Sequence, residues 1–313
     1  MYHIIINPMS RSGKGLKIWK REVEPLLHKE NAQYRSYFSR EAGDVARIMG
    51  EILTSATERP IRIILLGGDG TVNEAVQSID DNTDIILGYI PTGSSNDLAR
   101  DLEIPTTPAE ALRLILHDGE AFPMDLATVS YDDGSKRRFV VSCGIGFDAA
   151  VCEEALHSNI KKFFNKIGLG KLTYLGIALK QLITAKSAKC TITLDDGTTA
   201  TIKRLLFVTC MLHRYEGGGF MFCPDADASD GYLDLCAVGD CPKFLLLFAL
   251  PPAFKGKHYF MKGVTPYCAK KVRIETSAPL WLHTDGEVWR KTTALTVTCQ
   301  KHAIQMIGKK RDS

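Results

Sequence analysis

The sequence predicts a two-part fold, with an N-terminal doubly wound parallel α/β domain and a C-terminal, mostly antiparallel β-sandwich domain. In the first part of the chain, up to about Met124, short β-rich runs alternate with helical patterns, as in βαβ units around a parallel sheet. In the second part, short alternating segments follow one another, separated by turns that contain Asp-Gly pairs. A chain of 313 residues is also longer than a single core usually grows, so two domains are expected.

The N-terminal part contains strand segments rich in isoleucine and leucine, and helical segments whose apolar residues recur three or four positions apart. A Pro or a small polar residue opens several of the helical segments, as is common at the start of a helix. Strands are expected at residues 3–6, 61–66 and 85–90, and helices at 14–29, 45–53, 72–79, 96–102 and 107–117.

The C-terminal part is expected to consist mainly of strands, at residues 138–142, 189–194, 201–208, 232–238 and 271–275. Asp-Asp-Gly sequences mark its turns, because Asp tolerates turn geometry and Gly supplies a positive φ. Two helical insertions are expected, at 148–184 and at 243–254, and the second is apolar all round. We therefore place the domains at 1–124 and 125–299, with residues 300–313 returning to the first domain.

Composition and charge exclude several classes of protein. Lys and Arg total 39 against 36 for Asp and Glu, and this formal charge of +3 argues against a nucleic-acid binder driven by bulk charge. Nine cysteines without a Cys-x-x-Cys pair favour reduced, buried thiols and a cytoplasmic location. The N-terminus has no secretory pattern, and the longest apolar stretch, 244–254, is too short and too interrupted by proline to span a bilayer.

The sharpest motif is Gly67-Gly68-Asp69-Gly70-Thr71, which follows a predicted strand and precedes a predicted helix. Glycines let the backbone approach a polyphosphate, and the amides and dipole at a helix start favour its negative charge. A carboxylate repels phosphate unless a metal lies between them, so Asp69 indicates bound magnesium. A tight turn in which Asp69 caps the helix is the simpler interpretation, but two neighbouring turns favour phosphate binding.

These two turns also lie between a predicted strand and a predicted helix. Because the carboxyl ends of parallel strands meet at one edge of a sheet, the three turns can face one ligand. The turn at 7–15 lacks the spacing of a Walker loop, and simple helix capping would also explain the turn at 91–97. Their candidate residues are Asn7, Pro8, Ser10 and Lys14 in the first, and Thr92, Gly93, Ser94, Asn96 and Asp97 in the second.

Two Asp-Gly motifs in the β-rich part supply further acidic residues. Residues 228–234 contain Asp230, and residues 284–287 contain Asp285 and Glu287. Each motif alone is typical of a hairpin turn. Together with the loop at Asp69, they suggest that carboxylates from both parts of the chain serve one site.

The order of these motifs resembles the diacylglycerol kinase family. The Gly-Gly-Asp-Gly-Thr loop is shared with sphingosine, ceramide and NAD kinases, whereas Asn7-Pro8 and Gly93-Ser94-Ser95-Asn96-Asp97 look like the lipid-kinase branch. The resemblance covers nearly the entire chain, and the chain departs from the common pattern at Ser94 and at Val288-Trp289. It implies an interdomain cleft in which the γ-phosphoryl group of ATP passes to a lipid hydroxyl, with diacylglycerol as the leading acceptor.

The resemblance also implies a role for each candidate residue. Asp285 would be the general base for the lipid hydroxyl, and Glu287 and Asp69 would belong to the acidic network around Mg²⁺. Asp230 would hold a structural magnesium with the carbonyls of Asp227 and Tyr232, linked through water to Asp69, Asp97 and Glu287. ATP would contact the three turns and the first helical residues after the central loop: Asn7, Pro8, Ser10, Lys14, Gly67, Gly68, Asp69, Gly70, Thr71, Asn73, Glu74, Thr92, Gly93, Ser94 and Asn96.

A lipid acceptor implies peripheral contact with the inner face of the membrane. Basic and aromatic residues mix at 161–166 and 254–260, which suits an anionic surface, although core aromatics flanked by solvated lysines give the same pattern. No nucleic-acid partner is expected, and a homodimer stays open. Two other functions fit parts of the pattern: an NAD kinase, which phosphorylates a ribose hydroxyl, and a non-catalytic lipid- or nucleotide-binding protein that keeps the fold.

Overall fold

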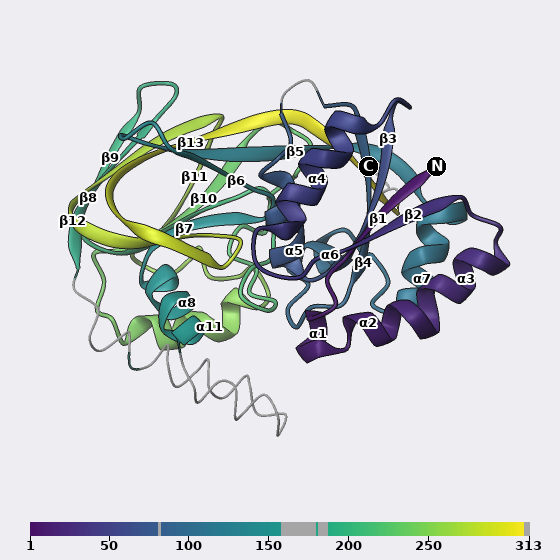
Figure 1. Ribbon diagram of the computed structural model, residues 1–313. Helices are drawn as coiled ribbons and strands as arrows, with labels where there is room; N and C mark the ends of the chain where they lie inside the picture. Colours follow the sequence, from purple (N-terminus) through teal and green to yellow (C-terminus); the bar gives the residue numbers. More distant parts are fainter. Residues whose placement is uncertain (81–82, 158–179, 181–186, 310–313) are drawn as a thin grey trace.

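The computed structural model describes residues 1–80, 83–157, 180 and 187–309. Hydrogen bonds among these residues join thirteen strands into one continuous sheet, which is parallel in the N-terminal half and antiparallel in the remainder. Figure 1 shows the helix-rich N-terminal half on the right and the β-rich half on the left. The predicted fold class is confirmed.

Four parallel strands form the sheet of the N-terminal half. They are β1 (Tyr2–Ile6), β2 (Tyr34–Phe38), β3 (Ile61–Gly67) and β4 (Ile85–Pro91), in the order β2-β1-β3-β4. All residues of β4 are buried, which explains its continuous apolar sequence. The sequence did not predict β2, because this edge strand is only partly buried and its apolar signal is weak.

Helices connect these strands, and every predicted helical segment of this half is present. The central glycine loop is itself part of α5, which begins at Asp69 rather than at Val72 as predicted. The elements are α1 (Ser10–Gly13), α2 (Gly15–Ile18), η1 (Trp19–Val23) and α3 (Glu24–Lys29), then α4 (Asp44–Ser55), α5 (Asp69–Val76), α6 (Asp97–Asp101), α7 (Pro108–Arg113) and η2 (Leu114–Asp118).

The β-rich half is built from long antiparallel strands and two described helices. The strands are β5 (Glu120–Tyr131), β6 (Lys136–Phe139), β7 (Ser142–Gly146), β8 (Ala188–Leu194), β9 (Thr199–Met211), β10 (Leu233–Gly239), β11 (Val264–Ala269), β12 (Lys271–Thr284) and β13 (Glu287–Gly308). The helices are α8 (Phe147–His157) and α11 (Leu245–Ala253). Most of the helical insertion predicted at 148–184, and the basic segment 161–166, lie outside the described residues.

The prediction of a single strand over 138–142 was wrong. The chain leaves the ladder between β6 and β7, because the amides of Val140 and Val141 donate to the carboxylate of Asp285 instead of to a neighbouring strand. The break therefore places backbone amides at a candidate catalytic residue.

Strand β13 joins the two halves of the molecule. It pairs antiparallel with β12 and β5, and near its end Gln305 and Met306 pair parallel to β4. The chain thus returns to the first sheet. The division into domains at 1–124 and 125–299 stays a prediction.

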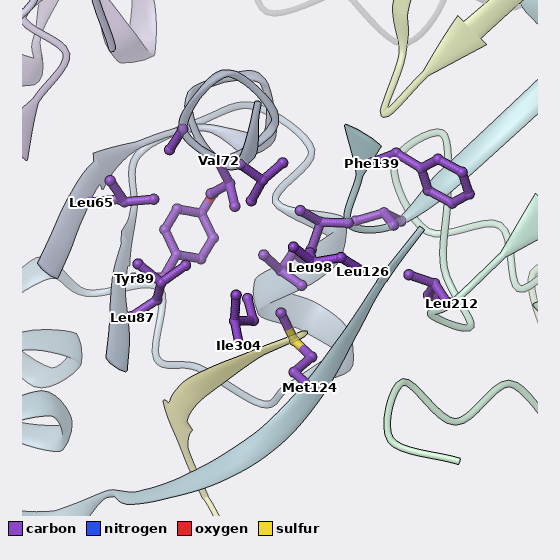
Figure 2. Packing of buried hydrophobic residues seen from close by; sticks show 14 of the residues in the cluster. Leu65, Val72, Leu87, Tyr89, Leu98, Met124, Leu126, Phe139, Leu212 and Ile304 are labelled. Atoms are coloured by element: carbon purple, nitrogen blue, oxygen red, sulfur yellow. The ribbon is translucent and has the colours of Figure 1, made fainter. Parts of the chain in front are cut away.

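One hydrophobic core runs through both halves (Figure 2). Leu65 and Tyr89 from the parallel sheet pack in the same cluster as Leu98 of α6, Leu126 of β5 and Phe139 of β6, all of them essentially without exposed surface. Burying a large apolar side chain contributes about 2 kcal/mol. This shared core holds the ends of β3 and β4 in a fixed position relative to the turn between β12 and β13. Of the described helices, none has both the length and the apolar character to cross a bilayer.

Candidate active site

Side chains at the ends of β1, β3 and β4 tie the three predicted turns together. The amide of Asn7 donates to the hydroxyl of Thr71 at 3.1 Å. The hydroxyl of Thr92 donates to that of Ser10 at 2.8 Å, and the Thr92 backbone N–H donates to the carbonyl of Gly67 at 2.6 Å. Three segments far apart in the sequence therefore form one surface at the carboxyl edge of the sheet.

Two glycines let the second and third turns approach each other at backbone distance. A Cβ atom on Gly93 would lie 2.7 Å from the Cα of Gly68, closer than such atoms come in folded proteins. Any side chain at this point would push the turns apart. The bare backbone next to the start of α5 is suited to bind phosphate oxygens.

Asp69 and Asp97 lie together beside these turns. The backbone N–H of Asp97 donates to Oδ2 of Asp69 at 3.0 Å, and the hydroxyl of Tyr89 makes a longer contact with Oδ1 at 3.4 Å. Burial, followed by the charge of Asp97, raises the pKa of Asp69 to about 7. Burial also raises the pKa of Asp97. Both carboxylates are thus costly to keep charged in the protein alone.

This pair fits a divalent cation. Oδ2 of Asp97 accepts the backbone N–H of Gly218 at 2.8 Å, but its Oδ1 is buried and has no hydrogen-bond partner. A buried oxygen without a partner loses the free energy of its former hydration. Hard cations such as Mg²⁺ prefer oxygen ligands, and their charge would relieve the repulsion between the two carboxylates. Asp69 and Asp97 would hold such an ion.

Asp285 occupies a two-residue hairpin loop between β12 and β13. Thr284 pairs with Glu287, and Asp285 and Gly286 both have positive φ, at 50° and 80°, as in a type I′ turn. The hairpin interpretation and the catalytic one are therefore compatible. The turn presents its carboxylate towards the N-terminal half.

Four donors surround the carboxylate of Asp285. Oδ1 accepts the backbone N–H groups of Val141 and Ser142, at 2.8 and 2.9 Å. Oδ2 accepts the N–H of Val140 at 3.0 Å and the side-chain amide of Asn73 at 2.8 Å. Asn73 belongs to α5, the helix that the glycine loop begins, so this bond connects the central loop to the β-rich half.

Glu287 and Asp285 complete an acidic group drawn from both halves. Oε1 of Glu287 lies 3.0 Å from the position that a Cβ atom on Gly70 would take. The charge of Asp285 contributes to the raised pKa of Asp69, after burial and after the charge of Asp97. The three residues predicted to be catalytic, Asp69, Asp285 and Glu287, thus lie around one site.

The other predicted nucleotide contacts differ in their surroundings. Lys14 and Ser94 are exposed, and Pro8 is partly exposed. Asn96 holds its own turn by accepting the N–H of Gly93 at 2.9 Å. Glu74 accepts the N–H of Gly43, and burial raises its pKa. Contact of all these residues with ATP stays a prediction.

The loop around Asp230 forms a second acidic group. The N–H of Gly231 donates to Asp125 at 2.7 Å, and that of Tyr232 donates to Asp230 at 2.8 Å. Burial, and then the charge of Asp227, raise the pKa of Asp230. Burial and the charges of Asp230, Asp225 and Asp227 raise that of Asp234 to about 6. These oxygen donors also fit a hard cation, with Asp230 and its loop carbonyls as the holders. The water-mediated link to Asp69 stays a prediction.

The sequence did not predict a third cluster, which lies behind the Asp285 turn. Nε2 of the fully buried His283 is 3.0 Å from Oε1 of Glu216 and 3.3 Å from Oδ2 of Asp148. Its other nitrogen, Nδ1, accepts the N–H of Gly286 at 3.2 Å. This cluster could not be recognised in the sequence, because Asp148 and Glu216 carry no recognisable motif.

The hydrogen bonds of His283 indicate a neutral ring whose proton lies on Nε2, the nitrogen that faces Glu216 and Asp148. Burial lowers the pKa of His283, but the carboxylates of Glu216 and Asp148 raise it by more than burial lowers it, so the net direction is upward. The N–H of Gly286, however, points at Nδ1 and requires a lone pair there, which places the ring proton on Nε2. With its proton on Nε2, the ring donates to the two carboxylates and supports the turn that carries Asp285.

A glycine-rich loop also reaches the site from the β-rich half. His213 and Arg214 bind the buried carboxylate of Asp101 at 2.7 and 2.6 Å, and Gly218 binds Asp97 at the other end of the same helix, α6. Residues 217–219 are three consecutive glycines with positive φ. The three glycines could have indicated an unusual turn in the sequence, but they do not reveal which carboxylate would accept hydrogen bonds from their amides.

Comparison with known proteins matches two family models to this chain. Residues 1–129 match the diacylglycerol kinase catalytic domain, and residues 140–308 match the YegS C-terminal NAD kinase beta sandwich-like domain. A diacylglycerol kinase from Mycobacterium tuberculosis is 29% identical over 283 residues, covering 90% of this chain and 87% of that protein. A diacylglycerol kinase from Staphylococcus aureus is 27% identical over 303 residues, covering 96% and 90%.

Solved structures share the fold. A diacylglycerol kinase from Bacillus anthracis superposes with a TM-score of 0.72 at 23% identity, covering 98% of this chain and 96% of that one. An NAD kinase from Archaeoglobus fulgidus in complex with ATP superposes with a TM-score of 0.50 at 13% identity, covering 100% and 94%. At these identities the likeness concerns the fold alone.

Proposed function

Because the chain belongs to the diacylglycerol kinase family of lipid kinases, we propose that it transfers the γ-phosphoryl group of ATP to the hydroxyl of diacylglycerol. The product would be phosphatidic acid. The observation that carries the proposal is the 2.8 Å hydrogen bond between Asn73 and Asp285. It brings the helix of the glycine loop, which would bind phosphates, next to the carboxylate that would receive the acceptor's proton.

The nucleotide would bind along the joined turns. Backbone amides at the start of α5 would donate to the phosphates, the close Gly68–Gly93 contact would leave room for them, and the exposed Lys14 would neutralise part of their charge. When bound, Mg²⁺ would supply charge neutralisation between the phosphates and the acidic residues. Asp69 and Asp97 would hold it, with Glu287 near by.

Asp285 would act as the general base. Its carboxylate is oriented by the three backbone amides of residues 140–142, so its position is fixed before the acceptor arrives. The bond from Asn73 would be exchanged for the lipid hydroxyl. As the proton moves to Asp285, the hydroxyl oxygen would form a bond to the γ-phosphorus and the bond to the β-phosphate oxygen would break, releasing ADP.

An acceptor panel tests this proposal. Purified protein is incubated with labelled ATP, Mg²⁺ and, separately, diacylglycerol, monoacylglycerol, ceramide, a sphingoid base, phosphatidylglycerol and NAD. We expect label in phosphatidic acid. Turnover of NAD alone would replace the proposal by an NAD kinase, and turnover of no acceptor would favour a non-catalytic relative.

A matched pair of variants tests the role of Asp285. Asp285→Asn keeps the size of the side chain but removes the base, so we expect kcat to fall by about 10²–10⁴-fold. Asp133→Asn changes an exposed aspartate in the turn between β5 and β6 and should leave kcat unchanged. Equal activity of both variants would refute the assigned role. We also propose that the protein works in the cytoplasm, where it would draw its acceptor from the inner face of the membrane.

A further inference from the structure

Helix α11 carries an unusual group of exposed aromatic side chains. Its sequence, residues 245–253, contains no polar or charged residue, and two prolines lie within it. Buried Ala249 and Ala253 form its inner side. The helix and its flanking segments carry four exposed phenylalanines: Phe244, Phe248, Phe254 and Phe260 are 59, 67, 50 and 80% exposed. In Figure 1, α11 lies on the lower rim of the β-rich half.

The charges around these phenylalanines are of one sign. Residues 241–270 contain five lysines and no aspartate, glutamate or arginine, whereas the whole chain carries a formal charge of only +3. Lys255, Lys257 and Lys262 are exposed. The only histidine of the segment, His258, is buried, and burial lowers its pKa. The surface thus combines exposed aromatic rings with three exposed lysines.

We propose that this α11 surface, defined by Phe244, Phe248, Phe254, Phe260 and the three exposed lysines, docks on an anionic lipid bilayer. The aromatic rings would enter the headgroup region, and the lysines would pair with anionic headgroups. A second copy of this chain is a poorer occupant, because a symmetric contact would bring the exposed lysines of the two copies together. The proposal rests on the proposed function in one respect, since a diacylglycerol acceptor resides in a bilayer.

The α11 surface is physically connected to the candidate active site. The ring of Phe254 stacks on that of Phe220, with centroids 4.0 Å apart, and Met221 donates its N–H to the carbonyl of Ala253. Phe220 pairs with Glu216 across the glycine turn, whose Gly218 binds Asp97. A bilayer that held α11 would therefore lie next to the loop that closes over the carboxylates. The acceptor would have a short path from the membrane to the site.

Vesicle binding tests the surface independently of catalysis. The protein is sedimented with vesicles of phosphatidylcholine alone or mixed with phosphatidylglycerol, at low and high salt. We expect binding to the mixed vesicles that salt weakens. Phe248→Ser/Phe260→Ser should weaken it by about tenfold or more, because two exposed rings no longer enter the bilayer. Phe38→Ser, which changes an exposed aromatic on β2, is the matched control.

A charge-reversal pair tests the basic border. Lys255→Glu/Lys257→Glu should abolish the preference for anionic vesicles, whereas Lys20→Glu/Lys29→Glu, at exposed positions of the N-terminal half, should leave it intact. Unchanged binding in both surface variants would overturn the proposal. A second result would also overturn it. If the wild-type protein is a dimer, and Phe248→Ser/Phe260→Ser makes it a monomer without weakening vesicle binding, the surface binds a second copy rather than a bilayer.

Kinase assays separate this proposal from the proposed function. The surface variants should phosphorylate a short-chain, water-dispersed diacylglycerol at the wild-type rate but vesicle-embedded diacylglycerol about tenfold more slowly. A protein that binds vesicles through α11 but phosphorylates neither form would refute the proposed function and leave the docking surface standing. Equal rates of wild type and variants on vesicles would refute the docking surface alone.

Discussion

Helix α6 carries a buried aspartate at each end, and the two have opposite surroundings. Asp101 is 0% exposed and is bound by His213 and Arg214, at 2.7 and 2.6 Å. Asp97 is 5% exposed, and its Oδ1 has no hydrogen-bond partner, while Nε of Arg100 lies 3.9 Å away. The carboxylate of Asp101 is paired at hydrogen-bond distance by two basic side chains, whereas that of Asp97 has only the more distant guanidinium of Arg100 and one oxygen without a hydrogen bond.

This difference separates a structural role from a functional one. Both contacts tie α6 to the same glycine-rich loop, so a description of burial alone would treat the two residues alike. A buried charge is stable when it is closely paired, and an incompletely paired one in a cleft is a candidate for a functional role. We therefore propose that the first end of α6 serves the site, whereas the second end holds the loop in place.

The largest expected effect follows from breaking the compensated end. Asp101→Asn leaves Arg214 without its anionic partner, so we expect the free energy of unfolding to fall by about 3–5 kcal/mol. Urea denaturation measures this change. Asp97→Asn, four positions earlier in the sequence, is the matched control and should change the free energy of unfolding by less than about 1 kcal/mol. Equal losses in both variants would remove the distinction between the two ends.

In catalytic activity, the order of the two variants should be reversed, with the direct loss in kcat at Asp97→Asn. Asp97→Asn keeps an acceptor for the N–H of Gly218 but removes a charge that would hold the cation, so we expect kcat to fall by about 10²–10³-fold. It should also weaken the stabilisation of the folded protein by added Mg²⁺, measured as the shift in Tm. A full Mg²⁺-dependent shift in Asp97→Asn would show that the ion is held elsewhere.

When divalent cations are removed, the raised pKa of Asp69 should make the stability of the protein depend on pH. The pKa of Asp69 is about 7 in the folded protein, above the value near 4 of an unfolded chain. Between these values the folded state keeps a proton that the unfolded state has lost. Stability should therefore fall as pH rises through this window, by up to about 1.4 kcal/mol per pH unit from this group. Denaturation in a chelator, compared with Asp69→Asn, isolates the contribution, and identical slopes would contradict it.

The sequence predicted those parts of the fold that depend on local pattern. The runs at β3 and β4 and the glycine loop between β3 and α5 follow from apolar periodicity and from the turn chemistry of Gly. β2 was not predicted because all five of its residues are partly buried or exposed, so that no apolar run marks the strand. The break between β6 and β7 was not predicted because the amides of Val140 and Val141 donate to a side chain more than 140 positions away.

The candidate site was predictable only where a residue belongs to a recognisable motif. Asp69, Asp97 and Asp285 stand in glycine-containing turns, and the structure brings all three together. Their supporting residues do not stand in such turns. Gly218, Glu216 and Asp148 reach the site only through the order of strands β7, β9 and β12, which no local pattern encodes. The sequence thus reveals the groups proposed to react, and the topology reveals the groups that position them.

The smallest expected effect concerns His283, which donates to two further carboxylates and supports the Asp285 turn. His283→Asn keeps an acceptor near the position of Nδ1 for the N–H of Gly286, and His283→Gln keeps a donor near the position of Nε2 for Glu216 and Asp148. If His283 positions Asp285, His283→Gln should lower kcat by about tenfold, or 1.4 kcal/mol, with little change in KM, and His283→Asn should retain more activity. The reverse order would mean that His283 acts through the carboxylates behind it, as a structural partner of Asp148 and Glu216.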